Sequence, residues 1–350
     1  YLATLSEEEK LQQWYEGIQL AEEECLTNGI TSFQDAGSSF EWIDRFRELA
    51  ESGELDLRLW VMIRHNADEM RDRLDPFPWL GVANDMLTVR AIKSEVDGAL
   101  GSFGAWLVDS YEDKPDFTGQ NTTEISAVEA IAELAYQHDL QLCAHAIGDR
   151  ANHEVLNVFE KYYQNAIGDS KDLRWRIEHA QHLLVEDIPR FAEMGVIPAM
   201  QGIHCTSDAP FVEKRLGHQR AKEGAYAWRS LLDAGAVIAN GTDAPVEDVN
   251  PIESFYASVT RKRIDNGFAF FPEQAMTRHE ALRSYTIDAA YAGFEDGIKG
   301  SIEVGKLADL TILSQNILEC SEEDILKTEV LFTIMGGDIK YESDHSRSKI

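Results

Sequence analysis

Two histidines and one aspartate follow apolar segments at the points where buried strands are expected to end. His145 and His179 each close such a segment, and Asp243 follows the apolar run Ala236–Ala239. Imidazole nitrogens and carboxylate oxygens are ligands that Zn, Fe and Mn ions accept in proteins. The pattern predicts a divalent metal site in which Asp243 also serves as general base. The alternatives are hydrogen-bonded core positions for the histidines and a turn N-cap for Asp243.

The surrounding chain alternates between strand-like and helical patterns. Strands are expected at 30–35, 55–63, 87–93, 140–145, 175–179, 196–201 and 236–243. Helical spacing is expected over 11–27, 43–51, 123–138, 149–165, 186–194, 225–234, 253–263 and 278–291. This alternation is typical of a parallel α/β sheet with right-handed connections. The stretch 98–119 is irregular and too long for a simple connector, so a functional loop is expected there.

Polar residues recur at the strand ends around the whole sheet, namely Asp35, Lys93, His145, His179, Gln201 and Asp243. That distribution favours a (β/α)8 TIM barrel over a doubly wound sheet, where such residues gather at one crevice. A dinucleotide-binding enzyme has little support, because no Gly-x-Gly-x-x-Gly follows the first strand. After residue 300 the pattern becomes β-rich, and 330–341 is expected to form a hairpin in a small β-domain.

Bulk properties exclude several classes of partner. The 350 residues carry a formal net charge of −30, which repels phosphate backbones and argues against nucleic-acid binding. No apolar run is long enough to cross a bilayer. The four cysteines contain no Cys-x-x-Cys pair, which favours a reducing, cytoplasmic compartment. Because the first residue is Tyr1, we expect the natural N-terminus to lie upstream.

Five segments together resemble the amidohydrolase superfamily: AHAIGDRA at 144–151, RIEHAQHL at 176–183, MQGIHCTSD at 200–208, YAWRSLLDAGA at 226–236 and GTDAPVEDVNP at 241–251. IKSEVDGALGS at 92–102 and GSIEVGKLADLTIL at 300–313 fit the same pattern. The nearest branch is that of the YtcJ-like and N-substituted formamide deformylase-like hydrolases, in amidohydrolase family 3. The resemblance implies a metal-dependent (β/α)8 barrel with a small β-sandwich built from both chain ends.

One expected motif is missing. The superfamily places a His-x-His pair on its first barrel strand, and none of the ten histidines here has that spacing. We therefore expect residues 1–300 to form the barrel without strand one, and 301–350 to form the C-terminal part of the sandwich, with the N-terminal portion lacking. The alternative is true loss of the pair, which would leave a non-catalytic amidohydrolase-fold binding protein without a complete metal site.

The resemblance also implies roles for individual residues. It makes Lys93, His145, His179 and Asp243 metal ligands, with Lys93 bridging two ions after carboxylation by CO2. Without the resemblance, Lys93 is an ordinary lysine at a strand end. An ion pair between Asp149 and Arg150 is expected to orient the loop after His145. Pocket positions, each equally compatible with a purely structural role, are His182, His204, Asp208, Arg229 and Ser102.

The function implied is metal-dependent hydrolysis of a non-peptide C–N bond in an amide, N-acyl or N-formyl compound, within EC 3.5. One or two divalent ions are expected, with zinc as the first choice and iron or manganese as alternatives. The expected partner is a small-molecule amide, with neither nucleic acid nor membrane involved. A homodimer is the expected assembly if the chain associates.

Overall fold

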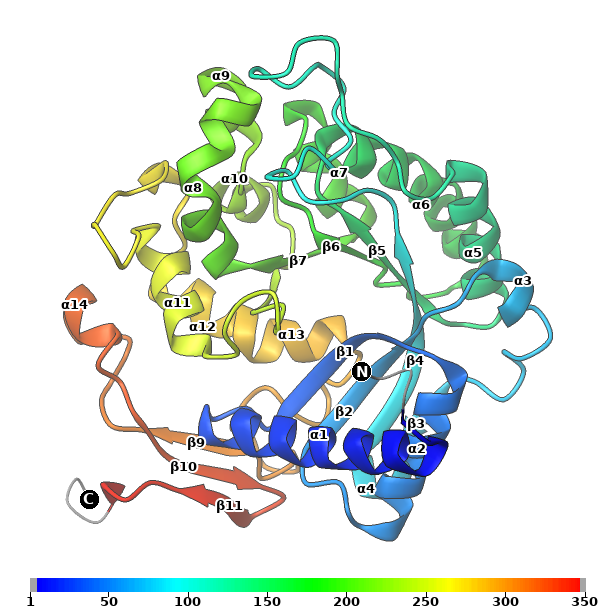
Figure 1. The fold of residues 1–350 in the computed structure, drawn as a ribbon, viewed down its shortest axis with the longest axis vertical. Helices are drawn as coiled ribbons and strands as arrows, with labels where there is room; N and C mark the ends of the chain where they lie inside the picture. Colours follow the sequence, from blue (N-terminus) through cyan, green and yellow to red (C-terminus); the bar gives the residue numbers. More distant parts are fainter. Residues whose placement is uncertain (1–4, 347–350) are drawn as a thin grey trace.

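A curled parallel sheet forms the centre of the computed structural model, which describes residues 5–346 (Figure 1). Its strands pair in the order β1-β2-β4-β5-β6-β7-β8, and the short β3 pairs antiparallel with β4. The strands are β1 (Ser32–Ser38), β2 (Arg58–Ile63), β3 (Trp79–Gly81), β4 (Leu87–Glu95), β5 (Gln141–Ala146), β6 (Arg176–His179), β7 (Ile197–Gln201) and β8 (Ala239–Gly241). The predicted parallel α/β fold is confirmed, because each expected strand is present and neighbours in sequence pair in parallel.

The sheet is open between its two outer strands. Within residues 5–346, β1 pairs only with β2 and β8 pairs only with β7. The described chain thus forms an incomplete barrel, seen in Figure 1 as an arc of strands from β1 (blue) to β7 (green). A first barrel strand between these two edges stays a prediction.

Helices pack on the outer face of the arc (Figure 1). Most of them cover the sheet because their apolar faces join its outward residues in one large core. Their bounds are α1 (Glu7–Thr27), α2 (Phe40–Ser52), α3 (Ala67–Met70), α4 (Val82–Asp85), α5 (Ile125–Gln137), α6 (Asp149–Asp169), η2 (Val185–Asp187), α7 (Ile188–Met194), α10 (Trp228–Asp233), α11 (Pro251–Thr260), η3 (Pro272–Gln274), α12 (Arg278–Tyr285), α13 (Ile287–Ala292) and α14 (Glu322–Ile325).

Two helical regions differ from the expectation based on the sequence. The run 278–291 is divided into α12 and α13 at Thr286, whose backbone leaves the helical region (φ −120°, ψ −98°). The stretch after β7 was not expected to be helical, but it forms α8 (Gly202–Leu216) and α9 (His218–Gly224). Gly202 follows β7 directly, and a side chain there would overlap the carbonyl oxygen of Ser254 on α11. A glycine is therefore needed where α8 crosses α11.

An irregularity in β4 decides which of its side chains face inward. Val61 pairs with Val89, and the next residue of β2, Met62, pairs with Ala91, so Arg90 is skipped. A β-bulge of this kind changes the alternation of side chains along a strand.

Beyond the bulge, the inner face of β4 carries Ala91 and then Lys93. Ala91 packs with Trp60, Met62 and Cys143 in a small interior cluster, and Lys93 is in register with Cys143. The bulge therefore turns Lys93 into the interior of the arc.

The C-terminal region forms a separate three-stranded antiparallel sheet of β9 (Leu310–Leu313), β10 (Val330–Met335) and β11 (Asp338–Glu342). The predicted hairpin is confirmed, with Gly336 and Gly337 in the left-handed region at its turn. The sheet is attached to the rest by a hydrogen bond from the Thr333 hydroxyl to the Leu26 carbonyl (2.6 Å). A complete β-sandwich stays a prediction.

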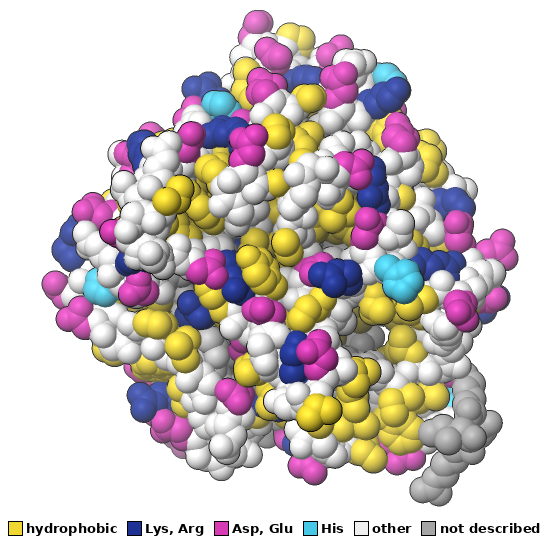
Figure 2. Space-filling view, turned by 180° about the vertical axis from the view of Figure 1, so that it is seen from behind, with side chains coloured by type: hydrophobic (Ala, Val, Ile, Leu, Met, Phe, Trp, Pro, Cys, Tyr) yellow, Lys and Arg dark blue, Asp and Glu magenta, His cyan; other side chains and the backbone are white. Residues whose placement is uncertain are grey.

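The surface mixes charges of both signs. Figure 2 shows acidic and basic side chains interspersed over one face, without a single large basic patch. Among the residues the structure describes, no helix is both long and apolar enough to cross a membrane.

Candidate metal centre

Three side chains from widely separated segments converge at the carboxyl ends of the strands. Potential ligand atoms of His179, His204 and Asp243 all lie within 4.8 Å of one another. His179 ends β6, Asp243 follows β8, and His204 lies in the first turn of α8. The Nε2 atom of His204 is 3.8 Å from Oδ2 of Asp243. This separation leaves room for an ion between the two groups.

The backbone at two of these positions is strained. His179 has φ 77° and Asp243 has φ 60°, both in the left-handed region that non-glycine residues seldom adopt. Such conformations cost on the order of 1–3 kcal/mol each and persist where the surroundings enforce them. The Nδ1–H group of His179 donates a hydrogen bond of 2.8 Å to Oε1 of Gln201, which fixes the ring. The lone pair of Nε2 is then available to bind a metal ion.

His145 adjoins this cluster without being one of its three members. Its ring packs edge-on against His179, with the centroids 4.4 Å apart. Its Nε2 atom is buried without a hydrogen-bond partner, and Oδ1 of Asp97 lies 3.5 Å away. The structure thus places His145 next to the expected site, with one free nitrogen.

Asp97 holds the segment that follows His145. Its carboxylate accepts hydrogen bonds from the backbone N–H groups of Ile147 (2.9 Å), Gly148 (2.8 Å) and Trp106 (2.8 Å). Burial raises the pKa of Asp97 to about 7, while these three donors act in the opposite direction.

The expected ion pair between Asp149 and Arg150 is not formed. The Asp149 carboxylate accepts from the N–H of Val108 (2.8 Å), and the Arg150 guanidinium lies 4.5 Å from the Trp106 ring. The sequence analysis predicted a functional loop after β4, but it did not predict that Asp97 would hold the segment after His145. The only signal for the role of Asp97 was its place, followed by Gly98, just after the end of β4.

Lys93 points into the interior beneath the cluster. It is 5% exposed, and burial lowers the pKa of its ammonium, against the attraction of Glu178 and Glu95. A lowered pKa increases the fraction of neutral amine, the form that reacts with CO2.

Burial controls the charge state of the three candidate ligands. It lowers the pKa of His204 to about 4 and that of His179 well below its ordinary value, with the charges of His145 and Lys93 adding to the effect on His179. Burial raises the pKa of Asp243 to about 6, partly offset by Lys93. The imidazoles are therefore neutral and able to donate a lone pair at neutral pH.

Other predicted pocket residues divide into two groups. Asp208 lies one turn after His204 on α8, and its Oδ2 accepts from the Tyr226 hydroxyl (2.5 Å). His182 is buried against Tyr226, with ring centroids 5.4 Å apart and neither ring nitrogen hydrogen-bonded. Both residues thus share contact with Tyr226, beside the cluster.

The second group makes local contacts. Arg229 forms an ion pair with Glu280 and hydrogen bonds to the Ala275 carbonyl. Ser102 is exposed and donates to the carbonyl of Ala99 (3.2 Å). Neither side chain contacts a member of the three-residue cluster in the described part of the chain.

The residues present fit a divalent cation. The donor set is two neutral imidazoles and one carboxylate, which suits zinc, iron or manganese. Nε2 of His204 and Nε2 of His145 are buried without hydrogen-bond partners, and unpaired buried polar atoms are costly unless something binds them. Coordination would satisfy these atoms.

A known protein family matches nearly the whole chain. The model of a family described as Amidohydrolase family matches residues 2–341. This chain belongs to the amidohydrolase family.

Several known proteins are similar to this chain in sequence. Protein LONG AFTER FAR-RED 3 of Arabidopsis thaliana is 36% identical over 260 residues, covering 74% of this chain and 44% of that protein. The amidohydrolase-like protein YtcJ of Bacillus subtilis (strain 168) is 29% identical over 93% of this chain and 61% of its own length. N-substituted formamide deformylase of Arthrobacter pascens is 30% identical over 64% and 41%, respectively. The predicted branch is confirmed, and the chain spans less than two thirds of each of these relatives.

Two solved structures have a fold similar to that of this chain. A metal-dependent hydrolase of uncharacterised function from Pyrococcus horikoshii OT3 superposes with a TM-score of 0.77 at 26% identity, covering 89% of this chain and 62% of that one. A similar hydrolase from Pyrococcus furiosus gives 0.72 at 26% identity, with 85% and 59% covered. The similarity therefore extends to proteins described as metal-dependent.

Proposed function

We propose that this amidohydrolase-family chain carries the metal-binding part of a hydrolase for a non-peptide C–N bond in an amide, N-acyl or N-formyl compound. The observation that carries the proposal is the convergence of His179, His204 and Asp243 to within 4.8 Å. The relationship to a protein named N-substituted formamide deformylase supports the class of substrate.

The residues of the cluster have different roles in this proposal. His179, held by Gln201, and His204 would bind the cation through Nε2, with His145 available beside them. When bound, a divalent cation polarises the substrate carbonyl and lowers the pKa of water to about 7.

Asp243 would move the proton during hydrolysis. Its carboxylate takes a proton from the water that attacks the carbonyl carbon and delivers it to the departing nitrogen. A C–O bond forms, the C–N bond breaks, and the products are a carboxylic acid and an amine. Lys93 would contribute as a carbamate, for which its burial supplies the neutral amine.

Metal content tests the proposed ligands directly. We expect His179→Ala, His204→Ala and Asp243→Asn each to weaken zinc affinity at least about tenfold, measured by elemental analysis after dialysis against a zinc buffer. His218→Ala is the matched control, because His218 is exposed and contacts Glu213 and Phe271 and no member of the cluster. Metal content unchanged in all three ligand variants would overturn the assignment.

Activity tests the proposed role of Asp243. With an N-formyl amine as substrate, we expect Asp243→Asn to lower kcat by about 10²–10⁴-fold, followed as amine release. A non-catalytic binding protein is the second candidate, because within residues 5–346 the cluster has only three members. Zinc binding without hydrolysis of any N-formyl or N-acyl amine would favour that candidate.

A further inference from the structure

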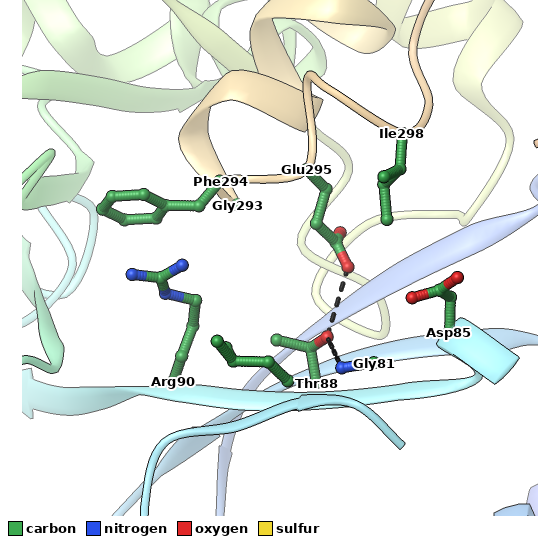
Figure 3. Close-up of a pocket in the computed structure, with 9 residues that line it drawn as sticks. Gly81, Asp85, Thr88, Arg90, Gly293, Phe294, Glu295 and Ile298 are labelled. Atoms are coloured by element: carbon green, nitrogen blue, oxygen red, sulfur yellow. Dashed lines mark hydrogen bonds between the residues drawn. The ribbon is translucent and has the colours of Figure 1, made fainter. Parts of the chain in front are cut away.

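A cavity of about 220 Å³ lies at the opposite end of the sheet from the candidate metal centre. It lies near the start of β4, and the segment after α13 covers it (Figure 3). Arg90 lines one side, Asp85 the other, and Glu295 projects between them. Lys93 is three residues beyond Arg90, about 10 Å along the strand.

Arg90 enters this cavity as a cation without a counterion. It is the residue that the bulge in β4 leaves unpaired with β2. Its guanidinium carbon lies 3.5 Å from the centroid of the Phe294 ring, and its Nε atom is buried without a hydrogen-bond partner. Among the described residues, no carboxylate forms an ion pair with it. Arg90 is half-buried and lines the cavity without a carboxylate partner, so its guanidinium offers charged hydrogen-bond donors to an anion that enters there.

The other end of the cavity is acidic. The Asp85 carboxylate forms no hydrogen bond or ion pair within residues 5–346, and it lies against Gly81, where any side chain would collide with it. Oε2 of Glu295 is 2.6 Å from Lys299 Nζ, so that carboxylate is already neutralised. Oε1 of Glu295 accepts only a long 3.4 Å hydrogen bond from the Thr88 hydroxyl. Acceptors for an ammonium group are thus present opposite the guanidinium.

We infer that this cavity binds a small zwitterionic amino carboxylate, whose carboxylate pairs with Arg90 and whose ammonium pairs with Asp85 and Oε1 of Glu295. A simple anion would leave Asp85 without a partner, and a simple amine would leave Arg90 unpaired. Only a ligand with both charges satisfies both ends. The cavity volume accommodates a molecule with a few carbon atoms between or beside its charged groups.

Calorimetric titration of the intact protein tests the site. The probes are L-alanine, β-alanine and 4-aminobutyrate, with butyrate and butylamine as ligands that carry one charge each. We expect at least one zwitterion to bind, and both single-charge compounds to bind about tenfold more weakly or not at all. Absence of binding by all three zwitterions, or equal affinity for butyrate, would overturn the inference.

Variants place the ligand in this cavity. Arg90→Met keeps an unbranched stem against Phe294 but removes the charge, and Asp85→Asn removes the acidic end. We expect each to lose about tenfold in affinity, whereas Arg71→Met, at an exposed arginine, keeps wild-type affinity. Wild-type affinity in either cavity variant would contradict the site, and Asp85→Asn decides alone if Arg90→Met does not fold. Zinc content should be unchanged in these variants, so this test is separate from that of the metal centre.

Discussion

At the scale of single residues, the region around the candidate metal centre is held by polar atoms whose partners are mostly backbone groups. Asp97 is the clearest case, because one carboxylate receives three backbone N–H groups from two different segments. Each hydrogen bond to a charged group contributes about 1.5–3 kcal/mol. The position of the loop that follows His145 therefore depends on a residue that does not belong to the three-residue cluster.

Replacing Asp97 tests this dependence. We expect Asp97→Ala to lower the free energy of unfolding by about 3–5 kcal/mol, because three buried N–H groups lose their acceptor. Urea denaturation measures the loss. Glu186→Ala, at an acidic residue in the first turn of η2, serves as control and should change stability by less than about 0.5 kcal/mol. A similarly small effect at Asp97 would show that the loop is held by other contacts.

His182 should make stability depend on pH. Burial, aided by the charge of Arg220, lowers its pKa to about 3, whereas an unfolded histidine has a pKa of about 6.5. Below pH 6.5 the unfolded state binds the proton and the folded state does not, so stability falls as the pH falls. From pH 7 to pH 5 this one group removes about 2 kcal/mol.

Denaturant unfolding of His182→Leu at pH 7 and pH 5 measures the contribution of His182 to the free energy of unfolding. The difference in stability between the variant and the wild type should shift by about 2 kcal/mol in favour of the variant at pH 5. A difference that is independent of pH would mean that His182 is already protonated or is solvated in the folded protein.

At the scale of elements, the long loop 96–124 packs against the start of α6. The N–H groups of Arg150 and Ala151 donate to the Trp106 carbonyl. A side chain on Gly148 would overlap that same carbonyl group. The close approach of loop and helix is therefore possible only with glycine at this position.

A pair of glycine substitutions checks this contact. Gly148→Ala should destabilise the protein by about 2–4 kcal/mol and make the loop more susceptible to proteolysis, because loop and helix must separate. Gly168→Ala lies near the end of the same helix with no atom within 4 Å of its added carbon, and should stabilise by up to about 1 kcal/mol. Equal effects of the two substitutions would contradict the close packing.

The strands and most helices are predictable because their apolar periodicity is simple and long. Helix α8 is not, since it starts with Gly202, contains Pro210 and follows β7 without a connecting residue. Its helical state depends on packing against α11, which no local pattern reveals. For this reason the sequence identifies His179 and Asp243 at strand ends but assigns His204 only to the pocket, although the structure brings it into the cluster.

At the scale of the whole molecule, a buried ion pair connects the parallel sheet with the C-terminal region. Arg58 at the start of β2 donates from Nε to Oδ2 of Asp309 (2.7 Å) and from Nη2 to Oδ1 (3.1 Å). Both side chains are almost fully buried. No pattern in the sequence indicates this pairing, because the partners are 251 positions apart.

A double-mutant cycle measures this connection. Arg58→Met should cost about 3–5 kcal/mol, because the buried Asp309 carboxylate loses its counterion and keeps only the hydrogen bond from the Gly336 N–H. Adding Asp309→Leu should recover much of the loss, since no uncompensated charge remains. Denaturant unfolding of the four proteins gives the coupling energy, and additive single effects would show that the pair does not join the two regions.

The bulge in β4 affects which single-codon deletions in this strand the fold can tolerate. Because the pairing with β2 already passes over position 90, loss of that codon would leave every other residue opposite its present neighbour. The arginine would go, while the lysine at 93 would still face the interior. Loss of the codon for Ile92, only two positions later, would instead turn that lysine towards the outer helices.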